Sequence, residues 1–136
     1  MTRQQILEPD ESVPLDQENA TRLWAIIDES VLNRIAGSPE IMKAQFGRLA
    51  EMARRPNVTI QIIPNAEGPT CAFGRAFSVL IPRNKNSTVL YFEDVDAARY
   101  VRDRDEVSRY MLIFDHLRAC ALNDRQSIDL IREVTK

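Results

Sequence analysis

The side chains best suited to chemistry lie in one short loop. Residues 66–75 are mostly small, but they include a thiol at Cys71, an aromatic ring at Phe73 and a guanidinium group at Arg75. Loops between strands often carry binding residues. We therefore expect this loop to form the rim of a ligand pocket, with Cys71 or Arg75 touching the ligand. The alternative is a plain connection in which Cys71 is half-buried and has no chemical role.

Three further residues flank this loop in the expected binding site. Phe77 and Tyr91 lie on the two strands that follow the loop, and Glu93 ends the second of them. A carboxylate at the end of an apolar strand can serve as a general acid or base. More commonly such a group caps a helix or pairs with an arginine.

The chain has a single histidine, His116, in a predicted helix. In an enzyme it would be the natural proton shuttle, with Glu93 and Cys71 as the other catalytic candidates. Asp115 is adjacent, but neighbouring helix positions do not face each other. Cys120 is four residues on and shares a helix face with His116, an arrangement that Cys–His catalysis could use. A surface histidine without a catalytic role is the simpler interpretation.

Composition excludes several classes of protein. The net charge is −2 and the 18 basic residues are scattered, so we expect no direct nucleic-acid binding. With two cysteines and one histidine the chain lacks the ligands of a common zinc site, and we expect no metal and no cofactor. No apolar run is long enough to span a bilayer, and the first residues do not resemble a signal peptide. We expect a cytoplasmic protein.

The elements that must position these residues follow from apolar spacing. Residues 1–20 form a partly extended N-terminal segment, and residues 23–27 suit a buried strand. Ser38 and Pro39 begin a helix that Pro56 ends, and alternation predicts a strand over 58–62.

The second half of the chain predicts a hairpin followed by helices. Residues 77–81 alternate and residues 88–92 form a second strand-like run, so together they predict an antiparallel hairpin, and a short strand is expected around 99–101. Asp103 begins the longest helix, with Glu106 in the capping-box position, and a final helix begins near Asp124. The length of 136 residues suits one domain. We expect an α+β fold with a small, mainly antiparallel sheet of three or four strands packed by three main helices. We also expect the aromatic residues, Trp24 among them, to face inward.

Several segments together resemble one family: the C-terminal domain of unknown function that follows an Xre-type helix-turn-helix in many actinobacterial, antitoxin-like transcriptional regulators. The most distinctive segment is Arg55-Pro56-Asn57-Val58-Thr59-Ile60-Gln61-Ile62-Ile63-Pro64. The other matching segments are residues 3–7, 27–32, 37–49, 77–80, 89–93, 114–122 and 127–132. The helix-turn-helix itself is not in this chain, and neither is the segment that normally precedes residues 3–7.

The resemblance implies a sensor role. Family members are thought to bind a small-molecule effector or a small partner protein, while their helix-turn-helix binds DNA. We therefore expect an effector- or partner-binding domain, with a homodimer as one oligomeric state to consider. The alternative is a stand-alone enzyme of the cyclase or isomerase type in a secondary-metabolite pathway, derived from such a sensor domain. A subunit that pairs with full-length regulators is a third hypothesis.

Overall fold

Ten elements make up the described part of the chain. The computed structural model describes residues 21–33, 37–67, 76–82, 87–93 and 95–135. In chain order the elements are β1 (Leu23–Asp28), η1 (Glu29–Asn33), α1 (Pro39–Met52), β2 (Val58–Ile63), η2 (Asn65–Glu67), β3 (Ser78–Leu80), β4 (Val89–Glu93), β5 (Ala98–Val101), α2 (Arg104–Cys120) and α3 (Asp124–Val134). The α+β class and the three main helices, with the longest near the C-terminus, are confirmed.

The strands divide between two small sheets. β1 and β2 pair in parallel, in a register that runs from Leu23 opposite Val58 to Asp28 opposite Ile63. β3, β4 and β5 form an antiparallel sheet in that order, which confirms the predicted hairpin and the short strand after it. The parallel pair was not predicted. Parallel strands need a long crossover connection, and η1 and α1 provide it here.

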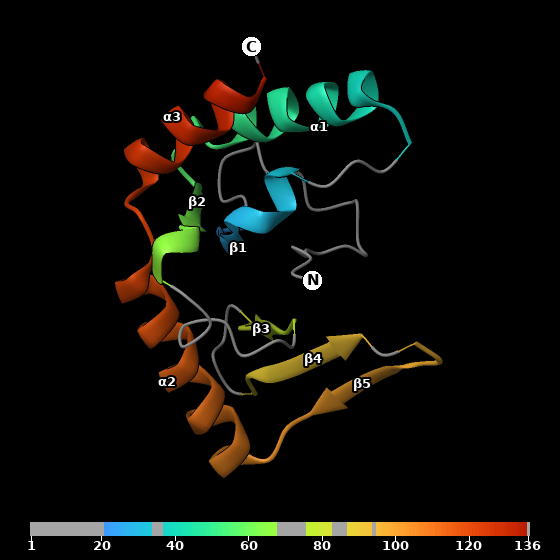
Figure 1. Cartoon of the computed structure of the whole chain (residues 1–136). Coiled ribbons are helices and arrows are strands. Elements are labelled where there is room, and N and C mark those ends of the chain that lie inside the picture. Colours follow the sequence, from blue (N-terminus) through green and yellow to red (C-terminus); the bar gives the residue numbers. More distant parts are fainter. Residues whose placement is uncertain (1–20, 34–36, 68–75, 83–86, 94, 136) are drawn as a thin grey trace.

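The larger core lies between the parallel pair and two helices. α1 and α3 lie side by side at the top of Figure 1, over β1 and β2. Ile60 and Ile62 of β2 are 1% and 0% exposed, and they pack with Phe46 of α1 and Ile131 of α3. Residues from three separate parts of the sequence therefore close one apolar interior, which is the main source of stability in a domain of this size.

A smaller core holds α2 against the antiparallel sheet. The ring of Tyr110 in α2 makes edge-to-face contacts with Phe77 and Phe92, at centroid distances of 5.0 and 5.1 Å. Phe92 and its neighbour Leu90 are fully buried. The predicted apolar face of α2 is confirmed as half-buried along its length, although none of its residues is fully buried.

All three helices begin with a side-chain cap. Ser38 accepts the Ile41 N–H at 3.2 Å, and Asp103 accepts the Glu106 N–H at 3.0 Å, as the sequence predicts. Asn123 and Gln126 form a reciprocal capping box at the start of α3. These bonds satisfy N–H groups that have no partner within a helix.

The link between α2 and α3 completes the free edge of β2. The Leu122 N–H donates to the Ile62 carbonyl at 2.9 Å, and the Ile62 N–H donates to the Ser127 hydroxyl at 2.8 Å. Ser127 is 0% exposed, so its hydroxyl takes the place that the next strand of a sheet would occupy. The hydroxyl in turn lies 3.4 Å from the Leu122 carbonyl, to which it donates.

Replacing this hydroxyl tests its role. Ser127→Ala leaves the buried Ile62 N–H without an acceptor, which costs about 1–3 kcal/mol of unfolding free energy. Urea unfolding followed by circular dichroism measures the change. Ser108→Ala, at an exposed position of α2, is the matched control and is expected to stay near wild type. If Ser127→Ala and Ser108→Ala unfold at the same urea concentration, the Ser127 hydroxyl does not have this stabilising role.

Candidate functional site

The predicted binding loop falls almost entirely outside the described residues. Cys71, Phe73 and Arg75 belong to the segment 68–75, so their place in a pocket stays a prediction. Phe77, Tyr91, Glu93 and His116 can be placed. They do not form one site.

The antiparallel sheet separates the predicted ligand residues onto two faces. Phe77 and Phe92 both contact Tyr110, so they face α2. Successive strand residues point to opposite faces, and Tyr91 and Glu93 therefore face away from α2. On that side the Tyr91 hydroxyl donates to the Glu93 carboxylate at 3.1 Å. The Tyr91 ring lies against that of Tyr100, with centroids 5.1 Å apart. Tyr91 and Glu93 are thus brought together, while Phe77 belongs to the smaller core.

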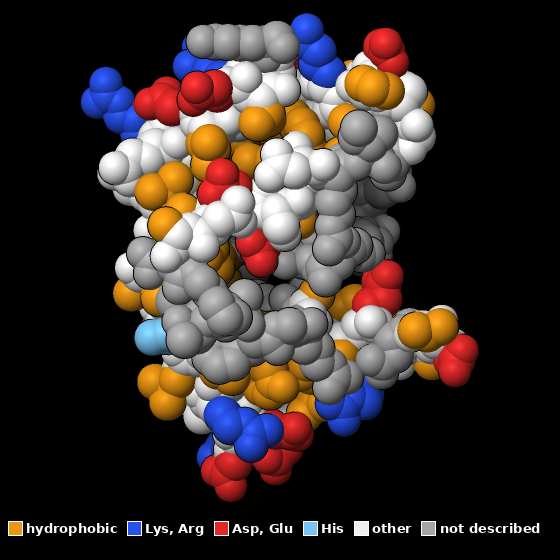
Figure 2. All heavy atoms as spheres, viewed as in Figure 1, with side chains coloured by type: hydrophobic (Ala, Val, Ile, Leu, Met, Phe, Trp, Pro, Cys, Tyr) orange, Lys and Arg blue, Asp and Glu red, His pale blue; other side chains and the backbone are white. Residues whose placement is uncertain are grey.

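His116 is exposed on α2 and is not assembled with Glu93. Its ring is at the surface, as the pale blue side chain in Figure 2 shows. Nε2 of His116 lies 3.8 Å from Sγ of Cys120, which confirms that the two residues share a helix face. Cys120, however, is disulfide-bonded. No thiol is available at this position for Cys–His catalysis, so that interpretation is wrong for the oxidised chain.

The disulfide at Cys120 predicts a redox-dependent stability. A bond of this kind typically contributes about 2–4 kcal/mol by restricting the unfolded chain. We expect Cys120→Ser to lower the melting temperature in the absence of reductant, and dithiothreitol to lower that of the wild type similarly. The chain has two cysteines in all, so dithiothreitol should not affect the variant further. A wild-type melting temperature that is indifferent to dithiothreitol would contradict the prediction.

An exposed aromatic–arginine cluster lies where β1 meets α2, and sequence reasoning missed it. Trp24, the only tryptophan in the chain, was expected to face inward but is 45% exposed. Along β1, Leu23, Ala25 and Ile27 contribute to the larger core. Trp24 has the opposite parity and so faces away from α1 and α3. The prediction failed because an unbroken apolar run does not reveal which of its two faces the helices cover.

The guanidinium group of Arg118 lies between two rings. Its Cζ is 4.8 Å from the centroid of Trp24 and 5.6 Å from that of Phe114, both within cation–π range. Arg118 also forms an ion pair with Asp115, one turn earlier on α2. The ion pair fixes the plane of the guanidinium group, and the stack holds the Trp24 ring against α2. We call Trp24, Phe114, Asp115 and Arg118 the Trp24 cluster.

A buried amide holds the other edge of the tryptophan. The indole Nε1 donates to Oε1 of Gln61 at 2.7 Å, and Nε2 of Gln61 donates to the Leu122 carbonyl at 2.9 Å. Gln61 is 8% exposed and lies on β2. A buried amide with both ends satisfied has little freedom to move. The exposed ring is therefore fixed in advance of any contact with a partner.

Such a cluster is suited to recognition. Tryptophan and arginine are the residue types that most often dominate the energy of protein interfaces. A ring that is already immobilised loses little conformational freedom on binding, which favours affinity. The signal lay in residues far apart in the sequence, and only the packing of α2 against β1 brings them together.

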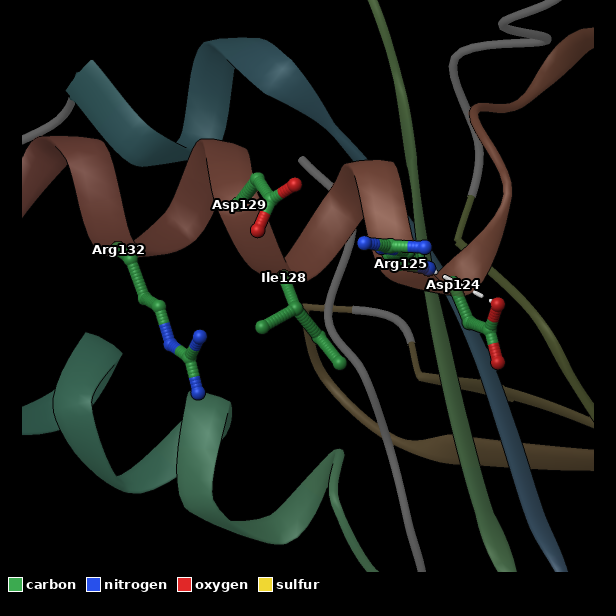
Figure 3. A pocket seen from close by; sticks show the side chains of 5 residues that line it. All are labelled: Asp124, Arg125, Ile128, Asp129 and Arg132. Atoms are coloured by element: carbon green, nitrogen blue, oxygen red, sulfur yellow. Dashed lines mark hydrogen bonds between the residues drawn. The ribbon is translucent and has the colours of Figure 1, made fainter.

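A surface groove lies along α3, away from the Trp24 cluster. It has a volume of about 350 Å³ and is lined by Asp124, Arg125, Ile128, Asp129 and Arg132, all on α3 (Figure 3). None of these residues was predicted to belong to a site. The residues that the structure describes contain no cluster of three or more His, Cys, Asp or Glu side chains that could hold a metal ion. Within the same part of the chain, no helix is long and apolar enough to cross a membrane.

Fold and site together define a small α+β domain with a parallel strand–helix–strand unit and an exposed aromatic–arginine cluster. A family model described as a domain of unknown function, DUF5753, matches residues 1–133, and the chain belongs to this family. Neither the curated proteins nor the solved structures give a match.

Proposed function

We propose that this chain is a binding module that recognises a partner protein through the Trp24 cluster, as the sensor domain of a transcription regulator of the Xre type would. The observation that carries the proposal is the 2.7 Å bond between the exposed Trp24 indole and the buried Gln61 amide. A large aromatic ring that is held rigidly and left half in solvent is the usual form of an interface anchor.

The chemistry around the ring favours a protein over a small molecule. Trp24 and Arg118 present flat, amphipathic groups to solvent: the Trp24 residue is 45% exposed, and the Arg118 side chain is 38% exposed. Small-molecule sites are concave and bury most of their ligand. Membership of the family supports a sensor role only through the resemblance to regulators described above. The actinobacterial origin and the cytoplasmic location belong to the same proposal.

A small-molecule effector is a second candidate, favoured by Tyr91 and Glu93. These residues place a phenol, a carboxylate and the neighbouring Tyr100 ring on one face of the antiparallel sheet. A compact ligand with an aromatic ring would suit this face, because the two tyrosine rings can stack with it. The segment 68–75 was predicted to border this ligand as well.

The first experiment separates these two surfaces. Proteins captured from cells that naturally make the chain are compared for wild type, Trp24→Ala, Arg118→Gln and Leu112→Ala. Leu112, 69% exposed on α2, is the matched control outside the cluster. We expect a partner bound by wild type and Leu112→Ala to lose at least about tenfold in affinity for the two cluster variants, as measured by calorimetry.

Two further readouts make the result decisive. Circular dichroism melts check that each variant is folded. Trp24 is the sole tryptophan, so its fluorescence should change when the purified partner is added to wild type. A partner that binds Trp24→Ala as tightly as wild type would overturn the proposal. If the partner still binds Trp24→Ala but no longer binds Tyr91→Phe, the protein contact lies on the face of the antiparallel sheet that carries Tyr91 and Glu93.

A further inference from the structure

We propose that the exposed face of α3 is a self-association surface, on which a second copy of the chain packs antiparallel about a two-fold axis near Ile128. This surface contains neither Trp24 nor Arg118. The self-association proposal can therefore be tested independently of the proposed partner-binding function.

The face has an apolar centre and a charged border. Ile128 is half-buried in the groove, while Asp124, Arg125, Asp129 and Arg132 are exposed around it. In Figure 3 these side chains leave the same helix, and Arg132 extends away from α3 rather than toward Asp129. The Asp124 carboxylate accepts the backbone N–H of Arg125 at 2.8 Å, the dashed line in Figure 3. Among the described residues no ion pair joins these four charges, so each charge can still pair with one of opposite sign on a second molecule.

The order of the charges is complementary to itself. Asp124 lies four residues before Ile128 and Arg132 lies four residues after it. Each is therefore about 6 Å from Ile128 along the helix axis, in opposite directions. Within one helix they are about 12 Å apart, too far for an ion pair.

A two-fold axis at Ile128 brings these charges into register. In such an interface residue i contacts residue j of the copy, and j contacts i. Antiparallel packing then sets Asp124 against Arg132 of the copy, and Arg132 against Asp124 of the copy. Ile128 meets its own equivalent at the axis.

The remaining charges favour the same arrangement. Arg125 and Asp129 of the copy fall within about 3 Å of each other along the axis and have opposite signs. If the two α3 helices packed in parallel, each charged side chain would face one of the same sign, which is unfavourable. The pattern therefore selects a second copy in one orientation.

Charge reversal at two positions gives a direct test. Sedimentation velocity over roughly 1 µM to 1 mM should show a monomer–dimer equilibrium for wild type, since a small interface binds weakly. Asp124→Arg places arginines opposite one another, and Arg132→Asp places aspartates opposite one another. We expect each variant alone to raise the dimer dissociation constant at least tenfold. Lys43→Glu, an exposed reversal on α1, is the control and should match wild type.

Mixing the two variants distinguishes the interface from a loss of folding. In a 1:1 mixture of Asp124→Arg with Arg132→Asp, both ion pairs of the two-fold contact are restored between unlike subunits. A heterodimer should appear at concentrations at which each variant alone is still monomeric. The double variant Asp124→Arg/Arg132→Asp should likewise dimerise as wild type does. A wild type that is monomeric at all concentrations, a dimer indifferent to Asp124→Arg, or a mixture that stays monomeric would each overturn the proposal.

Discussion

The hydrogen bonds between the α2–α3 link and β2 hold the two halves of this domain together. A two-stranded parallel sheet leaves the outer edge of β2 open, and buried backbone groups cannot stay unpaired. Leu122 and Ser127 close that edge. The residues that do so also end α2, which packs on the antiparallel sheet, and begin α3, which packs on the parallel one. One short link therefore sets the position of both helices.

The same link positions the Trp24 cluster. The Leu122 carbonyl accepts from Gln61, and Gln61 accepts from Trp24, so the exposed ring is tied to the backbone that joins the helices. Arg118 reaches the ring from the last turn of α2. One continuous set of polar contacts therefore joins the edge of β2 to the exposed Trp24 ring.

The sequence pattern predicted the helices and strands well, because helix caps and apolar periodicity depend on residues close together in the sequence. The caps at Ser38 and Asp103, the alternation over 77–81 and the apolar run through Phe92 were enough to place two helices and a hairpin. Two other features join residues that are far apart in the sequence: the parallel pairing of β1 with β2, and the stacking of Arg118 on Trp24. A short-range sequence pattern cannot predict such contacts. Glu93 and His116 were chosen as candidate catalytic residues by chemical type. Their separation depends on which face of a strand and of a helix each occupies.

The late position of Ile131 in the chain has a consequence for biosynthesis. This side chain is 0% exposed and packs in the same interior as Ile60 and Ile62, which precede it by just over half the length of the sequence. On the ribosome, β1, α1 and β2 emerge first and must wait with one apolar face uncovered until α3 is made. Contacts of such long range slow folding and prolong the exposure of apolar surface. During this interval the nascent chain is a natural client for chaperones that bind apolar segments.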